Sequence, residues 1–275
     1  MKIRKVIMAV SVILIIAGIA GIVFFLLQSK KTVDDFQELK KEIISVKEES
    51  DSDDDNKPEE EKELEYYEVG EEKVQKKFYD LYMRNRDFIG WITIDDTPVD
   101  YPVMHNFDNE EKYLHTDFDG NYNYAGCIFA STMSDITYPS DNILLYGHHM
   151  NTNIMFAPIM KYEDQEYAKK HKIIHFDTLV EDADYEVIAA FRTKIYPKDY
   201  KGFVYYKFND AFNEEEFNDY VNNAMSLSSI KMDTGAEYGD KLLSLSTCAY
   251  HTQDGRFVVV AKKIRSKKIT KLIGQ

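Results

Sequence analysis

Residues 242–264 read LLSLSTCAYHTQDGRFVVVAKKI, and this stretch decides the kind of fold that the chain must build. Two runs rich in apolar and β-branched residues, 242–247 and 256–264, flank a short, turn-rich segment from Ala249 to Gly255. This pattern predicts two strands paired as an antiparallel hairpin. Cys248 would end the first strand and Arg256 would begin the second, so both would lie at the same end of the sheet.

Strand-like runs of the same kind recur through the chain, with short helical patterns between them. Met155 to Tyr167 and Asn213 to Ala224 have helical spacing, and Asn213 with Glu216 is placed like a capping box. Many short strands joined by turns predict a mainly β fold with flanking helices, in which the strands form a closed or nearly closed barrel. The other strand-like runs are 90–94, 98–103, 126–131, 142–147, 172–177 and 185–195.

An apolar run from Val6 to Leu27 lies near the N-terminus. About 20 apolar residues in a helix span the hydrocarbon core of a bilayer, so we predict a transmembrane anchor over residues 6–27. Lys2, Arg4 and Lys5 precede the run, and the positive-inside rule places residues 1–5 in the cytoplasm and the domain on the outer face. The alternative is a cleaved signal peptide, whose apolar region would be shorter and would end in a small-x-small site.

Residues 28–70 have two different characters. Apolar residues recur at helical spacing from Val33 to Ile43, which predicts an amphipathic stalk or self-association helix, and we favour a solvated spacer. Glu48 to Glu63 is almost entirely acidic and polar, which predicts an extended linker. A calcium site there is a weaker interpretation, because the spacing does not match an EF-hand loop. The folded domain is expected over residues 71–275.

Charge and cysteine content narrow the functional classes. The chain has 275 residues, 34 Lys and Arg against 48 Asp and Glu, and a net charge of −14. This balance argues against non-specific nucleic-acid binding, which depends on clustered basic residues. The two cysteines, Cys127 and Cys248, could form one disulfide in an outward-facing domain. The alternative, which the motifs favour, is one buried thiol and one reactive thiol.

Three residues stand where chemistry could take place. His148 follows a strand that ends at Gly147, Cys248 ends a strand, and Arg256 begins one after the Asp254-Gly255 turn. Taken singly, each has an ordinary structural explanation: a structural histidine, a buried thiol and a charge on an edge strand. A metal site at His148 and His149 is disfavoured, because neighbouring residues in an extended chain point to opposite faces.

Together the three residues suit acyl transfer. A thiolate attacks a carbonyl carbon far better than a thiol does, and a nearby histidine can take the proton from Cys248 and later give it to a leaving amine. The tetrahedral intermediate carries a negative charge on oxygen. The guanidinium of Arg256 stays charged at any working pH and can donate hydrogen bonds to that oxygen.

The order of these motifs resembles the signature of the sortases, a family of cysteine transpeptidases. The motifs are Tyr-Gly-His at 146–148, Leu-Ser-Thr-Cys at 245–248, and Arg256 before an apolar strand. Residues 85–92, 100–103 and 125–129 are similar to segments of class B of that family. The similarity runs from about residue 72 to Ile264, which is nearly all of the expected domain.

The resemblance implies a sortase-like closed β-barrel with an N-terminal helix and an added helix, assigned to Asn213–Ala224, before the late strands. It implies cleavage of a C-terminal Pro-x-Thr type sorting motif in secreted proteins, after Thr. A thioester on Cys248 would form, and an amine of a peptidoglycan precursor would release it, as in a Gram-positive cell wall. His148, Cys248 and Arg256 carry over as catalytic histidine, nucleophile and oxyanion stabiliser.

The resemblance implies no cofactor and no metal, and it leaves some residues open. Ser246 and Thr247 are either walls of the substrate cleft or strand packing. His149 stands where class B commonly has Asn, and Cys127 stands where a small polar residue is common.

Other functions remain as alternatives. The first is a non-catalytic cell-surface binding module on the same fold, in which Cys248 would be inert and buried. A papain-like cysteine peptidase would carry a Cys-Gly-Ser-Cys-Trp type segment, which is absent from this sequence. A zinc hydrolase is weaker still, because the sequence has no His-Glu-x-x-His motif.

Overall fold

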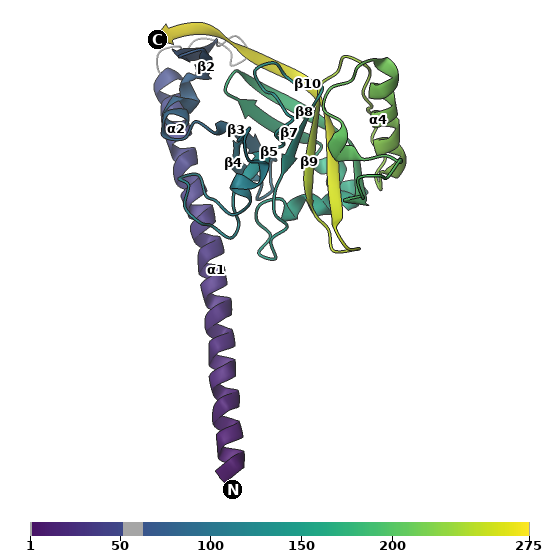
Figure 1. The fold of residues 1–275 in the computed structure, drawn as a ribbon. Coiled ribbons are helices and arrows are strands. Elements are labelled where there is room, and N and C mark those ends of the chain that lie inside the picture. The colour runs from purple at the N-terminus through teal and green to yellow at the C-terminus, as the bar shows by residue number, and fades with distance from the viewer. Residues whose placement is uncertain (1, 52–62, 275) are drawn as a thin grey trace.

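A long N-terminal helix runs along one side of a β-barrel in a computed structural model that describes residues 2–51 and 63–274 (Figure 1). The helix, α1, spans Lys2–Asp51, so it is about 75 Å long at 1.5 Å per residue. Its N-terminal half extends well beyond the barrel, and its C-terminal half lies against it (Figure 1). The predicted mainly β architecture with flanking helices is confirmed.

The eight strands predicted from the sequence are all present, and most boundaries are shifted by a few residues. The last strand, however, runs ten residues beyond its predicted end at Ile264, and two further strands, β1 and β2, were not predicted. The strands are β1 (Leu64–Val69), β2 (Glu72–Gln75), β3 (Phe88–Thr93), β4 (Asp100–Met104), β5 (Ile128–Ala130), β6 (Asn142–Tyr146), β7 (Ile173–Thr178), β8 (Glu181–Lys194), β9 (Leu242–Cys248) and β10 (Gly255–Gly274). The remaining elements are the helices α2 (Tyr79–Arg84), α3 (Gln165–Lys170) and α4 (Glu214–Leu227), and the 3₁₀ turns η1 (Lys76–Phe78), η2 (Glu110–Leu114), η3 (Ala157–Glu163) and η4 (Tyr205–Lys207).

The helical predictions differ from the structure in one respect and agree in another. The single helix expected over Met155 to Tyr167 is instead η3 followed by α3, because the Asp164 side chain accepts a hydrogen bond from the Tyr167 N–H at 2.8 Å and starts a new helix. The helix expected at Asn213–Ala224 is α4. Its N-cap is present, since Asn213 accepts from the Glu216 N–H at 3.0 Å. Glu216 reaches back to the N–H of Phe212, one residue before the N-cap, so the pair forms a variant of the capping box.

The barrel closes through strand β9. Among the described residues, the strand order β10-β8-β7-β3-β4-β5-β6-β9 returns to β10, because β9 pairs with β6 on one edge and with β10 on the other. The hairpin predicted from residues 242–264 is confirmed, with Arg256 directly opposite Cys248. A closed barrel leaves no free edge along these eight strands.

The late strands are buried on both faces. Phe257, Val259 and Ala261 of β10 belong to the main core inside the barrel, whereas Val258 and Val260 face a second core. Helix α4 covers that second core with an apolar stripe of Phe217, Tyr220, Val221 and Ala224. Two-sided burial explains why β10 is apolar without alternation from Phe257 to Ala261.

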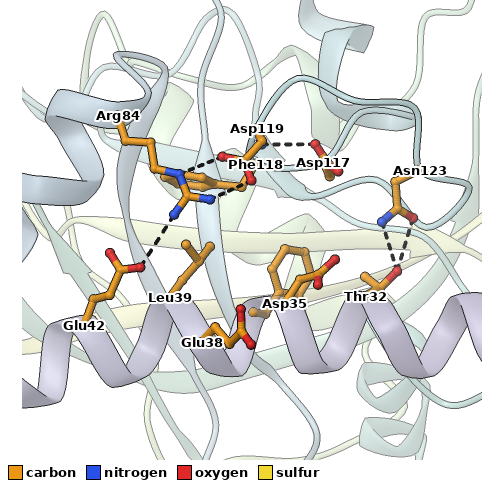
Figure 2. A pocket seen from close by; sticks show the side chains of 11 residues that line it. Thr32, Asp35, Glu38, Leu39, Glu42, Arg84, Asp117, Phe118, Asp119 and Asn123 are labelled. Carbon is orange, nitrogen blue, oxygen red and sulfur yellow. Dashed lines mark hydrogen bonds and ion pairs between the residues drawn. The ribbon is translucent and has the colours of Figure 1, made fainter.

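The segment expected to be a solvated spacer helix instead packs on the barrel. Phe36, Leu39 and Ile43 of α1 are buried and belong to the main core, and the ring of Phe36 meets that of Tyr101 edge to face. Figure 2 shows the polar side of this junction, where Asn123 donates to Thr32 at 2.9 Å and Arg84 pairs with Glu42 at 3.5 Å. The interpretation of this segment as a solvated spacer was wrong. An apolar stripe on a helix is stabilised when it is buried against another apolar surface, and here that surface is the barrel.

The linker prediction is tested only at its edges. Helix α1 continues to Asp51, so the first residues of the acidic segment are helical, and most of that segment lies outside the described residues. Strand β1 begins at Leu64, before the boundary expected at residue 71, and pairs in parallel with the C-terminal part of β10.

The N-terminal apolar run is exposed on α1. Within the described residues, one helix, Val10–Val46, is long and apolar enough to cross a membrane, and none of its most apolar part is buried. Such a helix is compatible with a membrane anchor, and a signal sequence would have the same properties.

Replacing Phe36 by Ala should destabilise the protein lacking its first 27 residues by about 3 kcal/mol, because a buried aromatic side chain is lost. Urea unfolding followed by the fluorescence of Trp91 measures this change. Trp91 donates to Asp100, which pairs with Lys40 of α1.

Ile44→Ala, on the same helix but 42% exposed, is the matched control and should change stability by no more than about 0.5 kcal/mol. Equal effects of the two substitutions on the free energy of unfolding would show that packing of α1 on the barrel does not depend on its apolar stripe.

Candidate active site

Three strands bring His148, Cys248 and Arg256 to one end of the barrel. Strand β9 lies between its partners, with Tyr146 of β6 opposite Ser246 in parallel register and Arg256 of β10 opposite Cys248. The parallel pairing continues past the end of β6, since Gly147 N–H donates to the Ser246 carbonyl at 3.1 Å. His148 therefore flanks Cys248 on one side, and Arg256 flanks it on the other.

Two glycines allow this close approach. A Cβ at Gly147 would lie 2.5 Å from Ile128 Cδ1 and 2.7 Å from the Phe156 ring, so only glycine fits immediately before His148. A Cβ at Gly255 would lie 2.1 Å from the Ala249 carbonyl oxygen, which the Gly255 backbone approaches as the β9–β10 turn closes. The preceding Asp254 has a left-handed φ of 55°, a conformation that Asp tolerates in turns.

The imidazole of His148 is oriented by a backbone carbonyl. Its Nε2 lies 2.7 Å from the carbonyl oxygen of Leu114, at the end of η2. Because a carbonyl only accepts, Nε2 carries the proton in the neutral ring and Nδ1 keeps the lone pair. The ring of His115 stacks on that of His148 with centroids 5.2 Å apart.

The charge state of His148 follows from these surroundings. Burial lowers the pKa of His148, the hydrogen bond to Leu114 raises it, and the like charge of His115 lowers it further, with a net fall below 6.5. The neutral form, which can accept a proton at Nδ1, is therefore the dominant one at neutral pH.

The two cysteines have opposite environments and no disulfide joins them. Cys248 is partly exposed, whereas Cys127 is 1% exposed and belongs to the main core. Burial raises the pKa of the Cys127 thiol well above its ordinary value, with further contributions from Asp117 and Asp119. Cys127 is thus held as an unreactive thiol, and Cys248 is the accessible one.

Arg256 keeps its guanidinium free of carboxylates in the part of the chain that the structure describes. Its Nη1 donates to the Gly255 carbonyl at 3.0 Å. Burial raises the pKa of Tyr205 to about 12, and the nearby charge of Arg256 opposes that rise. Because Arg256 lacks an anionic partner there, it can respond to a negative charge that appears on a bound molecule.

Ser246 and Thr247 are buried in the barrel wall. They are 1% and 2% exposed, and both hydroxyls have partners within the protein. Ser246 Oγ lies 2.7 Å from the Tyr205 hydroxyl, and Thr247 Oγ1 donates to the Gly147 carbonyl at 2.7 Å. This placement favours the packing alternative over the cleft-wall alternative, and the Thr247 bond ties β9 to the backbone just before His148.

His149 is oriented away from a shared metal site with His148. Its Nδ1 lies 2.9 Å from the Cys248 carbonyl oxygen, and its ring stacks on Tyr250 with centroids 5.4 Å apart. No group of three or more His, Cys, Asp or Glu side chains in the described ranges could hold a metal ion. His149 instead links the segment that follows β6 to the last residue of β9.

Sequence reasoning missed three contributors to this site: the Leu114 carbonyl, the His115 ring and the Tyr205 hydroxyl. A backbone carbonyl has no signature in the sequence. His115 and Tyr205 lie far from the motif residues along the chain, so no local spacing indicated them. Only an alignment or the tertiary structure could have found them.

The comparisons with known proteins point to one family. A family model described as "Sortase domain" matches residues 92–264. Sortase B of Staphylococcus aureus is 32% identical over 197 residues, which cover 71% of this chain and 78% of that protein. Sortase B of Listeria monocytogenes is 28% identical over 70% of this chain and 76% of its own length. The structure of an S. aureus sortase B–substrate complex superposes with a TM-score of 0.70 at 26% identity, covering 89% of this chain and all of that one.

The imidazole of His148 should titrate with a pKa below 6.5, since burial disfavours the charged ring. NMR titration of the assigned imidazole signals measures it. His115→Phe, which retains a ring to stack and removes the like charge, should raise that pKa without returning it to 6.5. A wild-type value above 6.5, or no response to the substitution, would contradict this picture.

Iodoacetamide should modify one cysteine in the native protein and two after denaturation, because Cys248 is accessible and Cys127 is buried. Intact-mass spectrometry counts the adducts. Cys127→Ala should leave the native labelling unchanged, whereas Cys248→Ala should abolish it. A Cys248 that resists the reagent in the folded protein would rule out its assignment as the accessible thiol.

Proposed function

This chain belongs to the sortase family, and we propose that it is a membrane-anchored transpeptidase that uses Cys248 as its nucleophile. The placement of Cys248 between His148 and Arg256, through the paired strands β6, β9 and β10, carries the proposal. A non-catalytic binding module would have no need of an accessible thiol whose neighbouring strands carry a neutral imidazole and a guanidinium with no carboxylate partner among the described residues.

Acyl transfer begins with the thiol of Cys248. We propose that Nδ1 of His148 accepts the proton of this thiol, because Nε2 is engaged in the hydrogen bond to the Leu114 carbonyl. The thiolate attacks the carbonyl carbon of the scissile peptide bond, and the imidazolium then gives a proton to the departing amine. A thioester on Cys248 remains.

We assign the stabilisation of the oxyanion formed in that attack to Arg256. The guanidinium stands one strand away from Cys248 and brings a permanent positive charge with several N–H donors. Such a donor lowers the barrier only if its position is set in advance, and strand pairing on both edges of β10 fixes its backbone.

The thioester is released by an incoming amine, whose nitrogen forms an amide bond with the acyl carbon as His148 takes its proton. The C–S bond breaks, and Cys248 leaves and regains that proton from His148. We propose that the acyl donor is a secreted protein with a C-terminal Pro-x-Thr type sorting motif, cleaved after Thr, and that the acceptor is an amine of a peptidoglycan precursor. This assignment follows the class B resemblance. We further propose that the domain lies on the outer face of a single-pass membrane protein, with residues 1–5 in the cytoplasm and residues 6–27 of α1 as the anchor.

Intact-mass spectrometry of the domain mixed with a panel of Pro-x-Thr peptides tests this function. An acyl adduct should form, and an added amine should remove it and yield the ligated peptide. Cys248→Ala should form no adduct, whereas Cys127→Ala should behave as wild type. A folded protein that forms no adduct with any peptide favours the non-catalytic module.

Arg256→Ala should lower kcat/KM by about 100-fold to 1,000-fold, the usual cost of removing an oxyanion donor. Arg265→Ala is the matched control, because Arg265 lies on the same strand, is exposed, and is remote from Cys248 in the strand register. Peptide-ligation kinetics measure both. Similar rates for the two variants would remove Arg256 from the mechanism.

A further inference from the structure

The contact between α1 and the barrel begins inside the apolar run. The ring of Phe25 packs against that of Tyr124 with centroids 5.8 Å apart, and Phe25 is partly buried by this contact. The apolar run ends at Leu27, two residues later. Two residues of helix are only about 3 Å of rise, so Tyr124 lies level with the end of the segment that would occupy hydrocarbon.

The barrel cannot turn freely about the anchor. Helix α1 continues without interruption from the apolar run into the docked half, where Phe36, Leu39 and Ile43 are buried. Polar contacts continue from Ser29, which accepts from Thr152 at 3.3 Å, to Thr32 and Glu42 (Figure 2). The direction of α1 in a membrane therefore also sets the direction of the barrel.

The catalytic end of the barrel faces the N-terminal half of α1. In Figure 1 the turn between β9 and β10 points along α1 toward its N-terminus, and Cys248 and Arg256 flank that turn. Ring contacts join this end to the anchor, since Tyr124 stacks on His115 at 6.1 Å and His115 stacks on His148 at 5.2 Å. The end that carries the nucleophile is thus the end that reaches the apolar run.

Tyrosines are exposed on this end. Tyr122 is 73% exposed, Tyr124 48% and Tyr250 77%. The acidic residues of the same loop have partners within the protein: Asp119 pairs with Arg84 at 2.6 Å, and Asp117 accepts from the backbone N–H groups of Asp119 and Asn121. Tyrosine is enriched at the membrane–water interface, where its ring is buried and its hydroxyl stays hydrated.

We propose that this end of the barrel rests on the surface of the bilayer that α1 crosses, with Tyr122, Tyr124 and Tyr250 in the interfacial layer. The proposal rests on the anchor in the proposed function. The partner is the lipid interface, recognised through aromatic side chains, because a chain of net charge −14 gains little from electrostatic attraction to anionic lipid. Cys248 then opens at the level of the headgroups, so the substrates it meets are those held at the membrane surface.

Tryptophan quenching by brominated lipid in nanodiscs tests the proposal on the full chain. Trp91, the one natural tryptophan, is buried beside Asp100, which pairs with Lys40 of α1. Lys40 lies 13 residues, or about 20 Å, beyond Leu27, so Trp91 stays far from lipid and serves as an internal control. Tyr122→Trp and Tyr250→Trp place probes at the catalytic end.

Leu272→Trp is the matched control, since Leu272 is 44% exposed and lies in the last three residues of β10. The C-terminus, just after β10, is at the opposite end of the molecule from the turn between β9 and β10 (Figure 1). Phosphatidylcholine brominated near the glycerol should quench the added tryptophan of Tyr122→Trp and Tyr250→Trp, in low and high salt alike. Wild type and Leu272→Trp should keep their emission.

Absence of quenching at both catalytic-end probes, or equal quenching of Leu272→Trp, overturns the membrane contact. Thioester formation with soluble peptides is measured separately on the same proteins. Peptide transfer without quenching would therefore contradict the membrane contact and leave the proposed chemistry intact. Quenching without an acyl adduct would contradict the proposed chemistry and leave the membrane contact intact.

Discussion

Strand β9 is paired on both edges, and the barrel and the candidate site depend on that pairing. Parallel bonds to β6 and antiparallel bonds to β10 close the barrel, and the same registers set His148 and Arg256 on either side of Cys248. Apolar cores on both faces of these strands hold them in place. Losing either register would open the barrel and separate Cys248 from His148 or from Arg256 in one step.

The local environments give different properties to residues of the same type, namely the two cysteines and the two adjacent histidines. One thiol is enclosed in the core and the other is partly exposed, so Cys248 is the thiol that solvent and reagents can reach. Of the two adjacent histidines, His148 hydrogen-bonds to Leu114 and His149 to the carbonyl of Cys248. Neither difference comes from residue type. Each comes from which backbone groups and side chains surround the ring or the thiol.

Helix α1 connects this site to the N-terminal apolar run. Its polar and apolar contacts with the barrel follow one stripe that begins at Phe25 and runs to Ile43. A flexible tether would let the site point anywhere, whereas a docked helix gives it one direction relative to the run. A chain of ring contacts runs from Phe25, at the start of that stripe, through Tyr124 and His115 to His148.

The sequence by itself determined the eight barrel strands, the β9–β10 hairpin, the capped helix α4 and the three motif residues, because hydrophobic period, turn residues and caps act over a few neighbouring positions. It did not indicate β1, β2 or the extension of β10 beyond Ile264. Only the tertiary structure decided that α1 packs on the barrel, that Asp164 splits the helix expected at Met155 to Tyr167, and that Leu114 and His115 hold His148. An apolar stripe shows that a helix buries one face but does not identify its partner. A carbonyl oxygen is the same in every residue, so its role depends on where folding places it.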